Sequence, residues 1–370
     1  MDEGPDHAAA MRVMNFGPGP GRLPLPVLEE VQRGLLDHAG TGISMLEHSH
    51  RGPSFEAVLA SAEGLLRELL PVPQSHAVLF MQGGATQQFA LVPMAFGRDV
   101  AMDYVDTGTW SRKAHAAAGF YGRPRWAARG TNEAGAYVRA PQTLELDPAA
   151  RYLHLTTNAT ITGVHYSALP ELPAGIPLVA DASSDILSGP RDIGRFALLY
   201  AGAQKNLGPA GVTVVIAARS FLEQARKDLP DAFRYDVFLA KRSAPNTPPT
   251  FAIHVLERVL RWVKAEGGVM AMDARNRSKA DAIYGALDAH SGFFRLPVEA
   301  ASRSRMNVVF RLPSPELEER LIAEAEAQGM VGLRGHRSVG GLRVSLYNAV
   351  EPSDAQALAG LLDAFARRHG

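Results

Sequence analysis

The chain has 370 residues, of which 46% are hydrophobic and 21% are charged, the composition of an ordinary globular protein long enough for a large and a smaller domain. Its 38 basic and 38 acidic residues balance, so no broad basic field indicates a nucleic acid partner. Because the sequence contains no cysteine, disulfides, thiolate metal sites and a cysteine nucleophile are excluded.

The first residues, "MDEGPDHAAAMRV", are acidic and small, and they lack the basic leader and the apolar run of a signal peptide. We expect a flexible tail over residues 1–14 and a cytoplasmic protein. No later apolar run reaches the length of a membrane-spanning helix, so we expect no membrane partner.

A cationic cluster precedes the first strongly periodic segment. The stretch "LEHSHRGPSFEAVL" (46–59) places His48, His50 and Arg51 directly before a predicted helix. A helix start exposes unpaired N–H groups and the positive end of the dipole, so this cluster indicates an anion site. A solvated surface loop is the alternative. The apolar face of the helix consists of Phe55, Val58, Leu59, Ala62, Leu65, Leu66 and Leu69.

Six short apolar segments then follow, several of them separated by stretches of helical length. They are "HAVLFM" (76–81), "DVAMDYV" (99–105), "YLHLTT" (152–157), "PLVADAS" (177–183), "FALLYAGA" (196–203) and "VTVVIAA" (212–218). This alternation predicts an α/β fold with a mostly parallel central sheet flanked by helices. In such sheets ligands bind at the carboxyl ends of the strands.

The Pro-rich segment "RSAPNTPPTF" (242–251) ends this series. A long helix follows, with Val255, Leu256, Val259, Leu260 and Val263 on its apolar face. The segments "SRMNVVFRL" and "GGLRVSLYN" are expected to form antiparallel strands around the helix "SPELEERLIAEAEAQG". We therefore predict a large domain over residues 15–260 and a smaller C-terminal α/β domain over residues 261–370.

Lys205 stands out among the six lysines of the chain. It lies in "LLYAGAQKNLGPAGVTVVI", inside a Gly/Pro-rich turn between two apolar segments, and it alone lacks a polar helical or surface-loop sequence around it. Such a setting favours a Schiff-base lysine, whose amine must be partly desolvated to be nucleophilic. A lysine that reaches solvent from a loop tip is the alternative.

A lysine that holds pyridoxal 5′-phosphate (PLP) needs partners, and candidates follow other predicted strands. Asp181 in "PLVADASSD" suits the pyridine nitrogen, although a turn or helix-capping role is an equal alternative. Trp110 in "YVDTGTWSRKA" suits the ring face, and Thr160 in "TTNATITG" offers a hydroxyl to the phenolic oxygen. The Gly83-Gly84 turn before the next predicted helix suits the phosphate.

Seven motifs together resemble one protein family. They are "NFGPGP", "SHRG", "DTGTWS", "ADASSDILS", "YAGAQKNLGPAG", "NTPPTF" and "GHRSVGGLRVSLYNA", and they extend from about Asn15 to the C-terminus. The family is that of the phosphoserine aminotransferases, which are class V aminotransferases within the fold-type I PLP-dependent transferases. The resemblance implies a large PLP-binding domain, a small C-terminal domain and a homodimer with shared active sites.

The resemblance also implies roles for individual residues. Lys205 would form the Schiff base, Asp181 would pair with the pyridinium, and Trp110 would stack on the ring. The other implied cofactor contacts are Thr160 at the phenolic oxygen, Ala85, Thr86 and Gln204 at the phosphate, and Asn246 and Thr247 at the phosphate from the neighbouring subunit. In one respect the chain departs from some members, which carry an arginine after the glycine turn, where this sequence has "GGATQQ".

The implied substrates are 3-phosphohydroxypyruvate and glutamate, which give phosphoserine and 2-oxoglutarate. Arg343 would clamp the α-carboxylate with a bidentate fork. The distal phosphate or carboxylate would be bound by His336 and Arg337, together with His50 and Arg51 of the other subunit. The sequence leaves open whether the phosphorylated threonine analogue on the route to vitamin B6 is also a substrate.

Other functions remain as alternatives. A cysteine desulfurase is excluded because the chain has no cysteine. An alanine–glyoxylate or serine–pyruvate aminotransferase would leave the cationic residues without an obvious role. A dinucleotide-dependent oxidoreductase would need a G-x-G-x-x-G turn after the first strand, which is absent. A non-catalytic sugar-phosphate binder would not need Lys205, so covalent capture of a cofactor distinguishes it.

Overall fold

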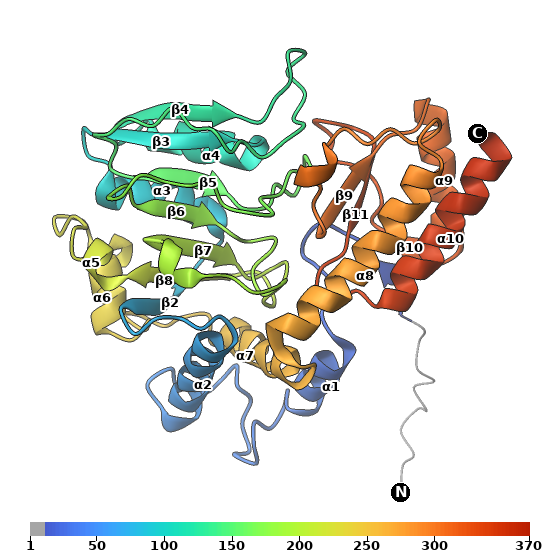
Figure 1. The fold of residues 1–370 in the computed structure, drawn as a ribbon. Coiled ribbons are helices and arrows are strands. Elements are labelled where there is room, and N and C mark those ends of the chain that lie inside the picture. Colours follow the sequence, from blue (N-terminus) through green and yellow to red (C-terminus); the bar gives the residue numbers. More distant parts are fainter. Residues whose placement is uncertain (1–11) are drawn as a thin grey trace, which may run out of the picture.

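A seven-stranded sheet forms the centre of the larger part of the molecule (Figure 1). The computed structural model describes residues 12–370. In spatial order the strands are β2 (His76–Gln82), β8 (Val212–Ala218), β7 (Leu198–Gly202), β6 (Leu178–Asp181), β5 (Leu153–Thr156), β3 (Ala101–Asp106) and β4 (Arg123–Arg129). All neighbours from β7 to β4 are parallel, whereas β8 is antiparallel to both β2 and β7. The predicted mostly parallel sheet is confirmed.

Strand β4 was not among the six predicted strands. Its sequence, "RPRWAAR", contains no apolar run, and most of its side chains are exposed or half-buried because β4 is an edge strand. The six predicted strands all exist. Each is buried on both faces of the sheet and is therefore mostly apolar.

Helices cover both faces of this sheet (Figure 1). The helices α2 (Pro53–Leu69) and α7 (Thr250–Ala265) share one hydrophobic core with Val214 and Ile216 of β8. Val215 and Ala217 point to the opposite core, because side chains alternate along a strand. That core also contains residues of α3 (Ala85–Phe96), α4 (Thr109–Ala118), α5 (Arg219–Leu222) and α6 (Tyr235–Ala240).

A second region lies beside the sheet and has its own core (Figure 1). Its strands β9 (Asn307–Phe310) and β11 (Leu342–Ser345) are antiparallel, as predicted. The remaining elements of this region are β1 (Met14–Asn15), β10 (Met330–Val331), α8 (Gly268–Ala289), α9 (Pro315–Ala327) and α10 (Pro352–His369). Elsewhere the chain forms α1 (Leu25–Arg33) and the short 3-10 helices η1 (Ile193–Arg195), η2 (Asp231–Phe233) and η3 (Ala300–Ser302).

The ends of the two regions bear on the predicted boundaries. Of the predicted tail, residues 1–11 lie outside the described residues, and Met14 pairs with Met330 in a parallel bridge. Helix α7 packs into the core of the large region, whereas α8 contributes Met272 to that core and Ile283 to the second one. The domain boundary between residues 260 and 261 stays a prediction. No helix within residues 12–370 has the length and apolarity needed to cross a bilayer.

Candidate active site

The predicted site residues meet at one edge of the sheet. Strands β3, β5, β6 and β7 are parallel, so their carboxyl ends lie at the same edge. Trp110 follows β3 in the first turn of α4, Thr160 follows β5, Asp181 ends β6, and Lys205 follows β7. The topology of the sheet therefore brings together four residues that are separated by up to 95 positions in the sequence.

Lys205 lies partly buried among these residues. Its Nζ donates a hydrogen bond to Oγ1 of Thr160 at 2.6 Å and lies 5.8 Å from the centre of the Trp110 ring. Burial lowers the pKa of Lys205 to about 8, an effect that the negative charge of Asp181 opposes and the positive charge of Arg343 reinforces. A lysine with such a pKa is a competent nucleophile near neutral pH.

Asp181 is buried, with only 5% of its surface exposed. One carboxylate oxygen accepts hydrogen bonds from the N–H of Ser183 at 2.9 Å and from its hydroxyl at 2.6 Å. Burial raises the pKa of Asp181, while Lys205 and the bonds from Ser183 oppose this shift. A buried carboxylate held in this way is suited to bind a protonated ring nitrogen.

The start of α3 forms a cradle for an anion. The helix follows Gly84 and has no side-chain cap, so the N–H groups of Ala85 and Thr86 point out of its positive end. The end of β7 approaches this point closely. A Cβ at Gly202 would lie 2.7 Å from Oε1 of Gln204 and 3.3 Å from the nitrogen of Ala85, so a larger residue there would crowd the start of α3.

Trp110 presents an unsatisfied polar group. Its Nε1 is buried and, among residues 12–370, has no hydrogen-bond partner. The ring lies near Phe89, at 6.5 Å between ring centres, and near the amine of Lys113 at 5.0 Å. A buried indole N–H without a partner is costly, so a bound acceptor would satisfy it.

A cavity of about 680 Å³ lies beside Lys205, Thr160, Trp110 and the Gly83-Gly84 turn. It is lined by Pro18, Gly19, Pro20, Gly83, Gly84, Trp110, Thr160, Ile161, Gln204, Lys205, Ala210, Gly211, His336 and Arg343. Arg343 is 5% exposed and donates to the carbonyl oxygen of Thr160 at 3.2 Å, while its buried Nε has no partner among the described residues. Burial and the nearby charge of Arg343 lower the pKa of His336, so its imidazole is neutral at pH 7.

Eight predicted residues do not line this cavity. Three of them, Asp181, Ala85 and Thr86, lie at the strand end and the helix start described above. His50 is half-buried, and its Nε2 has no partner within residues 12–370. The other four, which are exposed, are Arg51, Asn246, Thr247 and Arg337. The carbonyl oxygen of Thr247 accepts a hydrogen bond from the Gln82 side chain at 2.8 Å, which ties this loop to the end of β2.

Some lining residues were not predicted as site residues. Pro18, Gly19 and Pro20 form one wall, and a Cβ at Gly19 would lie 3.6 Å from the Lys205 side chain. With a φ of 142°, Gly19 adopts a backbone conformation that other residues rarely adopt. The signal was available, since "NFGPGP" concentrates glycine and proline before any predicted element.

Lys279 is a second buried lysine, which the sequence did not reveal. It is 0% exposed, and its Nζ donates to the carbonyl oxygens of Leu346 at 2.9 Å and Tyr347 at 2.8 Å. Its neighbours in α8, "RNRSKADA", are polar and gave no indication of burial. Burial alone therefore does not distinguish Lys205. Residues 12–370 contain no group of three or more His, Asp or Glu side chains suited to a metal ion.

The aminotransferase class-V family model matches residues 13–358 of the chain. The chain belongs to the class-V aminotransferase family. A phosphoserine aminotransferase of Herpetosiphon aurantiacus is 47% identical over 363 residues, which cover 97% of this chain and 100% of that protein.

Two solved structures of class-V relatives have nearly the same fold. The phosphoserine aminotransferase of Bacillus circulans subsp. alkalophilus is 46% identical and has a TM-score of 0.94, with 97% of this chain and 99% of that chain covered. A second phosphoserine aminotransferase, described for radiation damage of its Schiff base, is 44% identical with a TM-score of 0.93 over 96% of this chain and 99% of its own. The fold-type I architecture expected from the sequence is confirmed.

Proposed function

We propose that the protein catalyses the PLP-dependent transfer of an amino group from L-glutamate to 3-phosphohydroxypyruvate, giving O-phospho-L-serine and 2-oxoglutarate, a step of serine biosynthesis. The observation that carries the proposal is the position of Lys205. Its amine lies 2.6 Å from the Thr160 hydroxyl, in the wall of a cavity that also presents Arg343 and His336. The phosphoserine aminotransferases at 44–47% identity support the substrate pair.

The described residues fit PLP. The cavity has room for a substituted pyridine ring and its phosphate. Three features offer complementary chemistry: the uncapped start of α3 for the phosphate, the Asp181 carboxylate for the ring nitrogen, and the unpartnered Nε1 of Trp110 for an acceptor. When bound, PLP supplies an electron sink that stabilises negative charge at the substrate Cα.

Lys205 has two roles in this proposal. Its amine would hold the cofactor covalently in the resting enzyme, and when free it would accept the proton from the substrate Cα. Burial lowers the pKa of this amine to about 8, so more of it is neutral near pH 7 than of an exposed lysine, and a neutral amine is able to accept a proton. The Thr160 hydroxyl orients Nζ toward the cavity.

Arg343 and His336 would bind and orient the substrates. Arg343 is suited to a bidentate pair with the α-carboxylate, because its side chain is fixed by the bond to Thr160 and its Nε is still free to donate. His336 faces the same cavity and suits the distal phosphate or carboxylate, with Arg337 next to it in the chain. The phosphate of 3-phosphohydroxypyruvate and the second carboxylate of glutamate would bind to these same two side chains.

A second copy of the chain completes the site in this proposal. The side chains of His50 and Arg51 offer hydrogen-bond donors to the distal anion, and Asn246 and Thr247 suit the cofactor phosphate, yet none of them lines the cavity of one chain. Pro248 and Pro249 stiffen the loop that carries Asn246, so it is able to project across an interface. We therefore propose a homodimer with shared active sites. The cytoplasmic location stays a prediction.

Visible absorption spectroscopy tests the proposal. The purified protein is mixed with PLP and then with O-phosphoserine, glutamate, alanine or unphosphorylated serine. We expect a band of lysine-bound PLP that only phosphoserine and glutamate convert to the pyridoxamine form. Equal conversion by alanine or serine would assign another class-V specificity, and no band at all would refute the role of Lys205. The phosphorylated threonine analogue extends the same assay to the vitamin B6 step.

A further inference from the structure

A buried ion pair lies directly behind Asp181. Asp185, in the turn after β6, is 1% exposed, and one of its carboxylate oxygens accepts a hydrogen bond from Nη2 of Arg191 at 2.6 Å. The other oxygen accepts from the hydroxyl of Thr157 at 2.5 Å. The N–H of Thr157 in turn donates to the carbonyl oxygen of Asp181 at 2.9 Å. A continuous set of hydrogen bonds therefore connects Arg191 with the residue proposed to bind the ring nitrogen.

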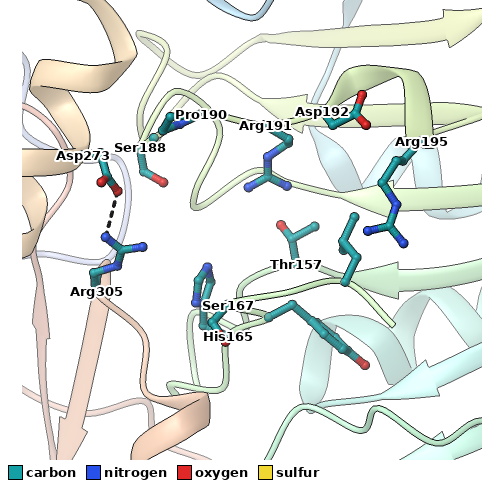
Figure 2. A pocket seen from close by; sticks show the side chains of 13 residues that line it. Thr157, His165, Ser167, Ser188, Pro190, Arg191, Asp192, Arg195, Asp273 and Arg305 are labelled. Atoms are coloured by element: carbon teal, nitrogen blue, oxygen red, sulfur yellow. Dashed lines mark hydrogen bonds and ion pairs between the residues drawn. The ribbon is translucent and has the colours of Figure 1, made fainter. Parts of the chain in front are cut away.

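Arg191 lines a hollow of about 200 Å³ and reaches Asp185 from there (Figure 2). Figure 2 shows the guanidinium of Arg191 pointing toward Thr157 and His165, with Arg195 and Arg305 farther along the wall. These two arginines have other partners, since Arg305 bonds Asp273 at 2.7 Å and Arg195 bonds the carbonyl oxygen of Pro170 at 3.1 Å. Arg191 is thus the arginine that contacts Asp185 directly.

The charge of Asp185 matters because a second buried carboxylate lies four residues earlier in the chain. Two carboxylates in a low-dielectric interior disfavour each other's ionised form, and Asp185 adds to the rise in the pKa of Asp181. A neutral Asp181 would no longer keep a pyridine nitrogen protonated. A cation bound to Asp185 offsets this repulsion.

Few other groups can balance Asp185. Nε2 of His165 is 3.7 Å from its carboxylate, but burial lowers the pKa of His165 to about 4, so this imidazole is neutral at pH 7. The charges of Arg191 and Arg305 lower that pKa further. The amine of Lys205 bonds Thr160 rather than Asp185, and it would no longer be a free amine when it holds the cofactor covalently. Arg191 then remains as the permanent cation of this cluster.

We propose that Arg191 is a positioning residue for the cofactor: by neutralising Asp185, it keeps Asp181 ionised and so keeps the pyridine nitrogen of PLP protonated. This inference rests on the proposed function, because it assigns the ring nitrogen to Asp181. It concerns the electrostatics of the site rather than contact with the substrate. Removing Arg191 should therefore lower the affinity only when Asp185 is charged, and only for a ligand with a basic ring nitrogen.

Equilibrium binding to the apoprotein tests both conditions. The ligands are PLP and an analogue in which C–H replaces the ring nitrogen, and the variants are Arg191→Gln, Arg191→Lys, Asp185→Asn and the double variant Asp185→Asn/Arg191→Gln. We expect Arg191→Gln to lose about tenfold in affinity for PLP, the effect of one pKa unit at Asp181, with little change for the analogue. Arg191→Lys and the double variant should recover the wild-type ratio of the two affinities.

The matched control is Arg195→Gln, which removes an arginine of the same hollow that has no buried carboxylate partner. It should leave both affinities unchanged. An equal loss for both ligands in Arg191→Gln, or no recovery in the double variant, would show that Arg191 only stabilises the turn and would overturn the proposal. If Arg191→Gln does not fold, the double variant and Asp185→Asn provide the test. A loss of affinity for PLP but not for the analogue in either of these variants contradicts the inference. A wild-type protein that does not bind PLP would refute the proposed function instead.

Discussion

Lys205 and Lys279 are both withdrawn from water, and burial lowers the pKa of each, yet they have opposite surroundings. Lys279 is 0% exposed and donates to two main-chain carbonyl oxygens, so its amine is committed to the chain at Leu346 and Tyr347. Lys205 has one hydroxyl partner, Thr160, and faces a cavity. A reactive lysine therefore differs from a structural one because its amine faces a cavity and can still bond a ligand. Burial alone does not distinguish the two.

Replacing Lys205 should have the largest effect. Lys205→Ala removes both the covalent attachment of PLP and the group that moves the Cα proton, so transamination should fall by on the order of 10⁴-fold. The measurement is the rate of 2-oxoglutarate formation from glutamate and 3-phosphohydroxypyruvate. Far-UV circular dichroism serves as the control for folding. Transamination at the normal rate in this variant would contradict the assignment of Lys205.

Replacing Lys279 should affect stability rather than chemistry. Lys279→Met leaves the carbonyl oxygen of Leu346 without a donor and leaves that of Tyr347 with only the N–H of Val350 at 2.9 Å. This should lower the free energy of unfolding by about 1–3 kcal/mol. Urea denaturation of the apoprotein measures this loss. The control is Lys264→Met, because Lys264 is exposed and pairs with Glu68 on the surface, where a change of less than about 0.5 kcal/mol is expected. Equal stability of Lys279→Met and the wild type would show that the hydrogen bonds from Lys279 to the two carbonyl oxygens do not stabilise the fold.

The lowered pKa of Lys205 predicts a pH-dependent stability difference. The pKa of this lysine is about 8 in the folded apoprotein, against 10.5 in the unfolded chain. The unfolded chain therefore binds the proton more tightly, which lowers the free energy of unfolding at pH values where the unfolded lysine is protonated. The penalty is complete below pH 8 and disappears as the pH rises toward 10.5. Lys205→Met should therefore be more stable than the wild type by on the order of 1–2 kcal/mol at pH 7.

Thermal unfolding of both apoproteins between pH 7 and pH 10.5 checks this prediction. The stability gap should narrow steadily as the pH rises. The exposed Lys227→Met is the matched control and should show a constant difference from the wild type. A gap for Lys205→Met that does not depend on pH would mean that its amine is not desolvated.

The smallest effect is expected from the hydroxyl beside Lys205. Thr160→Val removes the acceptor 2.6 Å from Nζ, which favours the charged amine, so the pKa of Lys205 should fall further, by roughly half a unit. The pH dependence of reaction of the apoprotein with an amine-selective acylating reagent, followed at Lys205 by mass spectrometry, measures this shift. Thr162→Val is the control, since its hydroxyl donates to Thr107 instead. A rise in the pKa would contradict the hydrogen-bond direction.

The sequence predicted those parts of the molecule that depend on residues close together in the chain. The six buried strands are mostly apolar, and Lys205, Asp181, Trp110 and Thr160 end such strands or follow them within four residues. Parallel pairing then brought these four residues to one edge. The edge strand β4 was missed because its exposed side chains are mostly polar, so no apolar run marks it.

Features that depend on contacts between distant segments were not predictable in this way. Lys279 looks like a surface residue of a polar helix, and only the packing of α8 against the chain after β11 buries it. The pair of Asp185 and Arg191 lies within an irregular turn, where neither spacing nor periodicity indicates a partner. His50, Arg51, Asn246 and Thr247 concern a second subunit and stay predictions.

The most direct test of the central claim is to find which lysine carries the cofactor. The protein is incubated with PLP, reduced with borohydride to make the attachment permanent, digested and examined by peptide mass spectrometry. The account predicts one phosphopyridoxyl group per chain, on Lys205 of the "AGAQKN" peptide, with Lys279 unmodified. Modification of Lys279 or of an exposed lysine, with Lys205 left free, would contradict it.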